Sequence, residues 1–396
     1  MIKSHSTIHI SLGAQLVLLF GANLTLVAGA SLSPVIPNMA LEYSTVPGVG
    51  LLISLVLTLP ALFVVLGGPI AGFLTDKLGR KPVLVLSILL GGFGGSLGVI
   101  INTLWGILFT RVLVGISIAG AMTATNSLIA DYFDGERRTK FMGRQAAIGG
   151  LISIVVLPIG GIVSEINWRL AFLTYLPLLI LLPLALFAIK EPEILDELDV
   201  STSEFDLRLN PVKGYIFAAG FLSQFGFVAV PIYIAYLLNG VLGTGGEVVG
   251  WLGAASSLFS FFAGMYYSSF SQRYKFKTIA IGNYILFFGG FLFLGFARSW
   301  MAVIIGELVV GFCMGLNNAN LANWLSNVVD IKIRGRANGI FVTLMSIGPF
   351  IAPFIYSPII SRWDYPSVFI ISGIIFALMA LAGMLIRSGA NYAQVG

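Results

Sequence analysis

Twelve long, uncharged segments constrain the fold of this chain more than any other feature of the sequence. A helix needs about 20 mostly apolar residues to cross a bilayer, and its backbone hydrogen bonds must be satisfied internally. The sequence therefore predicts an all-α integral membrane protein with twelve transmembrane helices. We expect these helices to begin near residues 11, 48, 82, 104, 145, 168, 214, 248, 278, 300, 337 and 365, with a break at 102–103.

The small number of charged residues agrees with a chain that lies mostly in lipid. Charged residues make up 10% of the chain, whereas a soluble domain carries about a quarter. The first apolar segment is longer than the core of a signal peptide and continues through Pro34 and Pro37. We therefore expect it to be retained as a helix.

The sequence lacks the catalytic residues of several classes of enzyme. Both histidines, His5 and His9, precede the first apolar segment, and Cys313 is the single cysteine. A catalytic triad, a metal site built from His or Cys and an internal disulfide are therefore not expected. The glycine-rich stretch 91–98 lies inside an apolar segment without an acidic partner, which favours helix packing over nucleotide binding. We predict no enzyme activity, no cofactor and no metal.

The distribution of lysine and arginine predicts the orientation of the helices. With the N-terminus in the cytoplasm, 18 of the 22 basic residues are cytoplasmic, and only Arg169, Arg298 and Arg362 lie outside. This asymmetry follows the positive-inside rule and predicts that both termini are cytoplasmic. Because the basic residues are spread over short loops, we expect the lipid bilayer as a partner and not nucleic acid. The compact loops favour a bacterial inner membrane, and we expect a monomer.

The two halves of the sequence resemble each other at a shift of 196 residues. This shift places Arg111 on Glu307, Asp134 on Asp330 and Arg138 on Arg334. An acidic stretch, 190–213, separates the halves, and we expect it to be solvated and to have no other role. The predicted domains are an N-terminal six-helix bundle (1–189), a cytoplasmic linker (190–213) and a C-terminal six-helix bundle (214–396). Parallel repeats of this kind place a substrate site near the midplane between the halves.

Four short motifs resemble the major facilitator superfamily. The loop between the second and third helices matches the pattern G-x-L-x-D-R-x-G-R-K, with Lys77 in place of the usual arginine. Its other matching residues are Gly72, Leu74, Asp76, Gly79, Arg80 and Lys81. Arg111 and Gly115 match the R-x-x-x-G pattern of helix four, and Pro34 and Pro37 match the P-x-x-P pattern of helix one. The stretch NWRLAFLTYLP (167–177) is similar to the drug-exporter branch.

The resemblance covers the whole chain and implies a twelve-helix secondary transporter that works by alternating access. One stretch departs from the pattern of the antiporter branches, which carry G-x-x-x-G-P-x-x-G-G in helix five. This chain has VVLPIGG at 155–161, so Leu157 stands where a glycine usually precedes Pro158.

Two charged residues fall within the predicted spans, and both suggest a role in proton coupling. An ionised side chain at the bilayer centre costs at least about 2.5–3.5 kcal/mol, so it should face a cavity or a partner. Arg111 and Glu307 are equivalent in the repeat and opposite in charge. We expect them to face each other across a central cavity, with Glu307 as the carboxylate that binds the proton. The alternative is that Arg111 only ties helix four to backbone carbonyls, with Glu307 as its static partner.

Polar and flexible residues on the same helices suggest a substrate cavity. Helical spacing places several of them on one face of helices four and ten, and others lie on helices one, five and seven. The candidate substrate residues are Asn23, Met122, Asn126, Gln145, Gln224, Tyr233, Tyr236, Met314, Asn317 and Asn318. The asparagine cluster at 317–323 favours contact with water or substrate, because amides facing lipid would be costly.

The resemblance also implies a gate in the loop 72–81. Asp76 would dock at the amino end of helix eleven, near Arg336, where the helix dipole favours an anion. Arg80 would pair with Asp131 at the end of helix four. These contacts would hold the halves in the outward-open state and separate in the inward-open state.

These features together predict a secondary transporter, with proton-coupled efflux of a hydrophobic or amphipathic compound as the first hypothesis. The second is a transporter of a defined polar solute such as a sugar, a siderophore-like chelate or a metabolite. A channel or a non-transporting membrane receptor is the third.

Overall fold

The fold of the chain is all-α in the residues that the computed structural model describes, which are 10–21, 23, 31–133, 135–192, 210–243, 245–330 and 333–386. The helices of the first half are α1 (Leu12–Gly21), η1 (Ser33–Val35), α3 (Ile36–Glu42), α4 (Val49–Leu78), α5 (Arg80–Ser96), η2 (Leu97–Val99), α6 (Leu104–Tyr132), α7 (Gly135–Ile166), η3 (Trp168–Tyr175) and α8 (Pro177–Ala188). Those of the second half are α9 (Pro211–Phe227), α10 (Ala229–Leu242), α11 (Gly246–Arg273), α12 (Phe276–Gly295), α13 (Trp300–Val328), α14 (Arg334–Arg362) and α15 (Tyr365–Leu385).

The predicted membrane spans are confirmed for eleven of the twelve segments. Eleven helical segments within the described residues are long and apolar enough to cross a membrane, and α9 and α10 together form one of them. The first predicted span is represented by the shorter apolar helix α1, followed by η1 and α3. The predicted break at 102–103 is also confirmed, because the Thr103 side chain caps the start of α6 by accepting from the Gly106 N–H.

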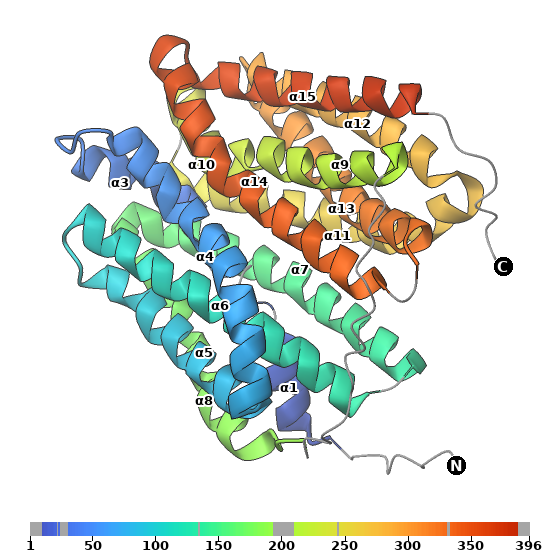
Figure 1. Ribbon diagram of the computed structural model, residues 1–396. Coiled ribbons are helices and arrows are strands. Elements are labelled where there is room, and N and C mark those ends of the chain that lie inside the picture. The colour runs from blue at the N-terminus through green and yellow to red at the C-terminus, as the bar shows by residue number, and fades with distance from the viewer. Residues whose placement is uncertain are drawn as a thin grey trace.

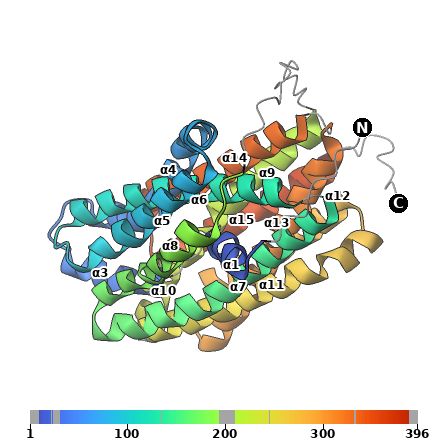
Figure 2. The same ribbon diagram turned by 90° about the horizontal axis from the view of Figure 1, so that it is seen from below.

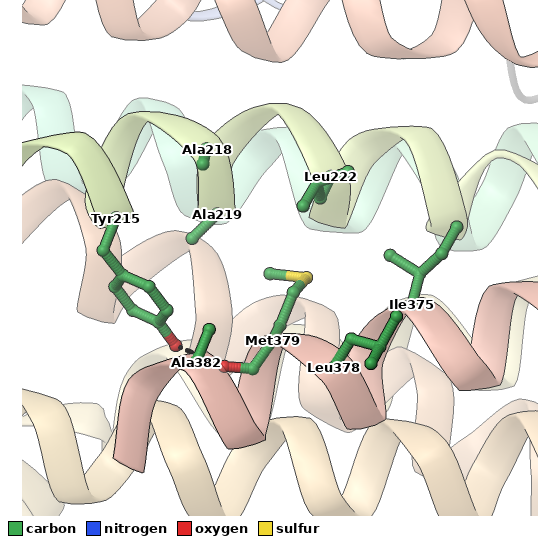
Figure 3. A pocket seen from close by; sticks show the side chains of 8 residues that line it. All are labelled: Tyr215, Ala218, Ala219, Leu222, Ile375, Leu378, Met379 and Ala382. Carbon is green, nitrogen blue, oxygen red and sulfur yellow. Dashed lines mark hydrogen bonds between the residues drawn. The ribbon is translucent and has the colours of Figure 1, made fainter. Parts of the chain in front are cut away.

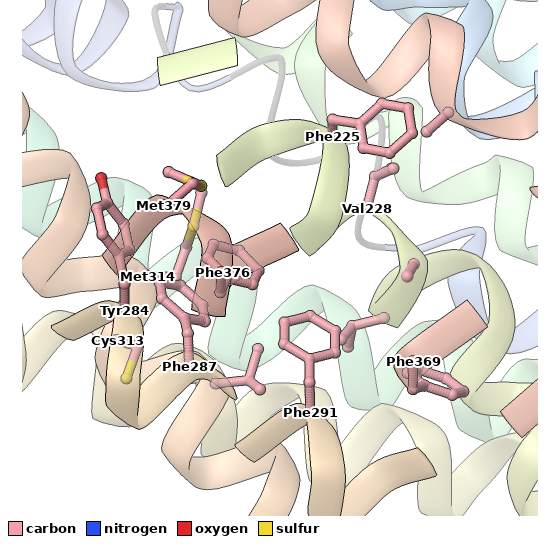
Figure 4. Close-up of a cluster of buried hydrophobic side chains, with 14 of the residues drawn as sticks. Phe225, Val228, Tyr284, Phe287, Phe291, Cys313, Met314, Phe369, Phe376 and Met379 are labelled. Carbon is pink, nitrogen blue, oxygen red and sulfur yellow. The ribbon is translucent and has the colours of Figure 1, made fainter. Parts of the chain in front are cut away.

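The helices form two bundles that lie side by side (Figure 1). The helices α1–α8 occupy the lower left of that view and α9–α15 the upper right. Buried apolar residues form separate cores in the two groups, and the largest core is built from residues of the second half. Figure 4 shows part of that core, where Phe287, Phe291 and Phe376 stack closely. Most of the predicted linker, 193–209, lies outside the described residues, so the domain boundaries stay predictions.

The predicted repeat register of 196 residues is confirmed by the helix boundaries. Helices α6 and α13 both contain 29 residues and begin 196 residues apart, and α5 and α12 begin at the same separation. The register also reproduces a packing contact. A Cβ atom on Gly115 would collide with the backbone of Pro60, and one on the equivalent Gly311 would collide with the backbone of Ser256. Asp134, one of the residues paired by the repeat, lies outside the described residues.

Candidate functional site

Arg111 is completely buried within the first bundle. Its guanidinium donates to the Tyr175 hydroxyl at 2.9 Å, to the Gly95 carbonyl at 3.1 Å and to the Thr110 hydroxyl. It also lies over the ring of Phe172, 4.9 Å from the centroid. All of these partners belong to α5, α6 and η3, so the side chain points into its own bundle.

The packing of α5 against η3 explains how the Arg111 guanidinium comes within reach of Gly95 and Tyr175. Gly95 and Gly98 lack side chains where Tyr175 and Phe172 pack, and a Cβ atom at either glycine would collide with these rings. The glycine-rich stretch 91–98 therefore serves helix packing, as the sequence suggested. The close approach also exposes the Gly95 carbonyl to the guanidinium of Arg111.

Glu307 is 3% exposed and lies on α13 beside α11. The Ser256 hydroxyl donates to the Glu307 backbone carbonyl at 3.1 Å. The carboxylate oxygen Oε2 has no hydrogen-bond partner among the described residues. A buried carboxylate with an unpartnered oxygen is unfavourable when ionised, which suits a group that carries a proton during a reaction cycle.

The prediction that Arg111 and Glu307 face each other is wrong. No ion pair joins them in the described structure, where the hydrogen-bond partners of the Arg111 guanidinium are Tyr175, Gly95 and Thr110. Arg111 donates to partners on α5, α6 and η3 of its own bundle, whereas Glu307 lies beside Ser256 of α11 in the other bundle. The guanidinium therefore points away from the second bundle. The alternative for Arg111, a tie to backbone carbonyls with Glu307 as static partner, holds in part: Arg111 bonds to the Gly95 carbonyl and to two hydroxyls, but not to Glu307.

Two of the predicted cavity residues form a reciprocal tie between α1 and α7. The Asn23 amide donates to the Gln145 carbonyl at 3.1 Å and to the Leu19 carbonyl at 2.7 Å. The Gln145 amide donates back to the Leu18 carbonyl at 3.0 Å. Both side chains are buried, so their donors stabilise helix packing in this state.

Two of the four asparagines in the cluster on α13 also form structural contacts. The Asn320 amide donates to the Phe276 carbonyl, and the amides of Asn323 and Asn327 donate to carbonyls one turn earlier on α13. Asn317 is buried, with an amide nitrogen that has no partner among the described residues, and Asn318 is exposed.

The remaining candidates lie in three different environments. Asn126 is exposed, whereas Met122 and Gln224 are partly buried. Met314 is wrongly predicted as a cavity residue, because it lies in the hydrophobic core between Tyr284, Phe287 and Met379 (Figure 4). Its flexible side chain fills space between aromatic rings, which is a common role for methionine.

The two bundles are joined at one end of the molecule, which we call the closed end. Hydrogen bonds cross between the bundles at this end. The Ser33 hydroxyl donates to the Pro231 carbonyl, Ser54 pairs with the Tyr233 hydroxyl at 3.4 Å, and the Glu247 N–H donates to Glu165 Oε1 at 3.4 Å. The third of these joins the end of α7 to the start of α11.

The two candidate tyrosines of α10 lie at this closed end. The Tyr233 ring packs edge-on against Tyr356, with the ring centroids 6.0 Å apart. Tyr236 stacks on Tyr365 with the centroids 4.6 Å apart and the planes 3° from parallel. Tyr233 is therefore part of the contact between the bundles, through Ser54, and Tyr236 packs beside it.

Helices α7 and α11 lie side by side over much of their length (Figure 2) and pack closely, from Gly161 against Gly246 to Gly150 against Phe261. Leu157, which replaces the glycine of the antiporter pattern, lies against Gly250 and Gly253 of α11. A Cβ atom on Gly250 would lie 2.6 Å from the Leu157 carbonyl oxygen. The bulk added on α7 is thus matched by glycines on α11, and the close helix contact is retained.

The predicted ion pair of the gating loop is confirmed. Arg80 Nε lies 3.1 Å from Asp131 Oδ2, at the end of α6. Asp76 and Arg336 are both exposed, and Asp76 forms no hydrogen bond or ion pair with any residue that the structure describes. The docking of Asp76 onto α14 is therefore not formed in this state. Gly72 has open space around its Cα, whereas Gly79 has a φ of +96°, a conformation that favours glycine.

Sequence reasoning missed Glu191, which lies at the start of the predicted linker. Its carboxylate accepts from the backbone N–H groups of Arg80 and Lys81. The expectation that the whole linker is only solvated is therefore wrong at this residue. Its position just after an apolar run gave no local pattern, because its partners lie more than 100 residues earlier.

Cavities in the described parts of the molecule include the following two. One, of about 280 Å³, lies between α9 and α15 and is lined by apolar side chains and Tyr215 (Figure 3). The Tyr215 hydroxyl donates to the Met379 carbonyl, so this cavity offers no free polar group. The other, of about 60 Å³, lies at the closed end and is lined by Asn38, Glu165 and Asn239 among others. Neither contains a predicted substrate residue. The described residues contain no group of His, Cys, Asp or Glu that could hold a metal ion.

The repeated architecture is matched by a known family. A family model described as the Major Facilitator Superfamily matches residues 18–215 and again residues 216–392. The chain belongs to the Major Facilitator Superfamily. As a member, it is a multi-pass membrane transporter of small molecules and not an enzyme.

Similar proteins include a named resistance protein, a named exporter and a solved sugar transporter. The class H tetracycline resistance protein of Pasteurella multocida is 27% identical over 368 residues, which are 88% of this chain and 90% of that protein. The bacillibactin exporter of Bacillus subtilis (strain 168) is 25% identical over 361 residues, 86% of this chain and 88% of that protein. The solved inward-open xylose transporter XylE of E. coli has a TM-score of 0.75 at 15% identity, covering 94% of this chain and 95% of that one.

Proposed function

We propose that this protein exports a hydrophobic or amphipathic small molecule in exchange for protons. The observation that carries the proposal is Glu307, an acidic residue buried inside a membrane-spanning helix of a transporter fold. The names of the similar exporters support the direction of transport and the class of substrate. We further propose a monomer in a bacterial inner membrane, with both termini in the cytoplasm.

In this orientation the closed end faces outward, and we assign the structure to a state that opens toward the cytoplasm. The unpaired Asp76 supports this assignment, because the proposed latch between Asp76 and the start of α14 should be open in such a state. In the outward-open state Asp76 would approach the N–H groups near Arg336 and stabilise contact between the halves. Asn126 and Asn318, both exposed on α6 and α13, are our candidates for contact with the substrate.

We propose that Glu307 carries the proton without an ion pair to Arg111. A carboxylate buried among apolar groups and beside Ser256 holds a proton until solvent or substrate reaches it. We propose that the movement between states changes the access of water to Glu307 and so couples proton release to substrate movement. Arg111 acts in this scheme as a rigid tie between α5, α6 and η3.

Transport in proteoliposomes with an imposed pH gradient tests the proposal. Wild-type protein should concentrate tetracycline or an amphipathic dye against its gradient, and should not concentrate xylose. Glu307→Gln should lose this uphill transport but keep exchange of labelled for unlabelled substrate, because exchange needs no proton. Asp364→Asn, which changes an exposed acid at the start of α15, is the control and should behave as wild type. Uphill transport by Glu307→Gln at the wild-type rate would refute proton coupling through this residue.

A further inference from the structure

The amino end of α5 is capped by a carboxylate from a distant part of the chain. The Arg80 N–H donates to Glu191 Oε1 at 2.6 Å, and the Lys81 N–H donates to Glu191 Oε2 at 2.7 Å. The first N–H groups of a helix have no partner within the helix, and the helix dipole favours an anion at this end. Glu191 therefore supplies both the hydrogen-bond acceptors and the charge that this helix end requires.

Gly79 of the gating loop is adapted to this contact. Its φ of +96° is a conformation that side chains disfavour. A Cβ atom at this position would lie 2.8 Å from Glu191 Oε1 and 2.9 Å from Glu191 Cδ. The glycine is thus required for its backbone conformation and also for the space that the carboxylate occupies.

Two more contacts join the same three segments of the chain. Arg80 pairs with Asp131 at the end of α6, and the neighbouring Tyr132 hydroxyl donates to the Lys190 carbonyl. The loop between α4 and α5, the end of α6 and the beginning of the linker are therefore fixed to one another. This set of contacts lies at the opposite end of the helices from the closed end.

We propose that Glu191 is a positioning residue for the gate. It fixes the start of α5 and so determines where the preceding loop presents Asp76 and Arg80 to the second bundle. It also fixes the first residues of the linker, 190–192, on the gating loop. Glu191 contacts neither substrate nor proton carrier. The inference depends on the proposed alternation between two states, and not on the substrate or the coupling ion.

The bidentate contact predicts a difference between glutamate and glutamine at this position. A carboxylate accepts two N–H groups, whereas an amide offers one acceptor and turns its own N–H₂ toward the second donor. Glu191→Gln keeps the size of the side chain and loses one hydrogen bond and the charge. Glu191→Asp keeps the charge and both acceptors and should restore part of the function.

The decisive measurement combines exchange kinetics with a distance between the bundles. Spin labels at Met142→Cys on α7 and Ser268→Cys on α11, in a Cys313→Ser background, report the separation at the end that carries the gating loop. Exchange of labelled substrate gives KM and kcat without a pH gradient. We expect Glu191→Gln to lower kcat at least about fivefold, the lower end of typical coupling between sites, with KM within about twofold. Its distance distribution should lose the population in which this end is closed.

Controls separate a positioning role from a loss of folding. Asp364→Asn removes a matched acid that begins a helix but makes no side-chain capping bond, and it should match wild type. Gly79→Ala should impair kcat strongly in the wild-type background and less than additively together with Glu191→Gln, since both disturb the same contact.

Three outcomes would overturn the inference. They are an unchanged kcat in Glu191→Gln, an equal loss in Asp364→Asn, and strictly additive effects of Gly79→Ala and Glu191→Gln. A single distance in the wild-type protein under all conditions would instead refute the alternation itself. Failure of proton coupling alone would leave these kinetic and distance results unchanged, because they are measured without a pH gradient.

Discussion

The contact between α7 and α11 gives a sharp test of how the closed end is maintained. In Gly250→Ala the new Cβ atom would meet three backbone atoms, which are the Leu157 oxygen at 2.6 Å, Pro158 Cα at 3.0 Å and the Leu157 carbonyl carbon at 3.1 Å. Backbone atoms in the middle of a helix cannot rotate away as a side chain can. The two helices must therefore separate by a substantial fraction of an ångström wherever the closed end is formed.

The cost of this separation can be estimated from packing energies. Adding a methylene-sized group to a tightly packed contact costs about 1–3 kcal/mol. A gap of 0.5–1 Å along the interface also loses about a quarter to a half of each contact's attraction. Because 1.4 kcal/mol corresponds to a factor of 10, the population of the state closed at this end should fall about 5- to 150-fold relative to the alternative state.

Gly264→Ala provides a matched control on the same helix. Nothing lies within 4 Å of the position that a Cβ atom would take at Gly264, which is exposed. Both substitutions replace glycine by alanine inside α11, so both raise helix propensity by about 1 kcal/mol. Any difference between them therefore reports the contact with α7.

Spin labels at Met142→Cys and Ser268→Cys measure the result as a distance distribution. For Gly250→Ala we expect the short distance between these labels to gain population, because opening of the closed end brings the opposite ends of the bundles together. For Gly264→Ala we expect the wild-type distribution. If the two variants give the same distribution, the α7–α11 contact does not determine the equilibrium between the states, and the reasoning from Gly250 is wrong.

Two further predictions concern charged residues. Arg111→Lys should lower the thermal stability of the purified protein by the equivalent of about 1.5–3 kcal/mol, because a lysine cannot reproduce the bonds to Tyr175 and Gly95. An unchanged melting temperature combined with lost transport would instead favour a direct role of Arg111 in transport. Asp76→Asn should leave the binding affinity for substrate within about twofold of wild type and lower turnover about fivefold or more, because the proposed latch acts only on the change of state. Substrate titration measures the affinity and exchange measures the turnover. Lost binding with unaltered turnover would contradict the latch.

The architecture could be predicted because it depends on one-dimensional properties of the sequence. The length of each apolar segment decides whether it can cross a membrane, and eleven of the predicted spans correspond to helices. The repeat register also required only the sequence, because α6 and α13 begin 196 residues apart. The ion pair Arg80–Asp131 could be predicted because the family resemblance implies it.

The direction of buried side chains could not be predicted in the same way. The sequence identified Arg111 and Glu307 as charged residues within predicted spans, but it did not indicate which residues their side chains contact. Arg111 turns into its own bundle because Gly95 allows Tyr175 and a free carbonyl to come within reach. Met314 was assigned to a cavity from helical spacing, although aromatic rings from α12 and α15 enclose it.

The sequence by itself determined the membrane spans, their number and the two-fold repeat, since these follow from hydrophobic length and residue order. Only the tertiary structure decided how the gating loop is held. Glu191 acts on Arg80 and Lys81 across 111 and 110 positions of the chain, respectively. Contacts over such distances depend on how the helices pack, and no local pattern of residues encodes them.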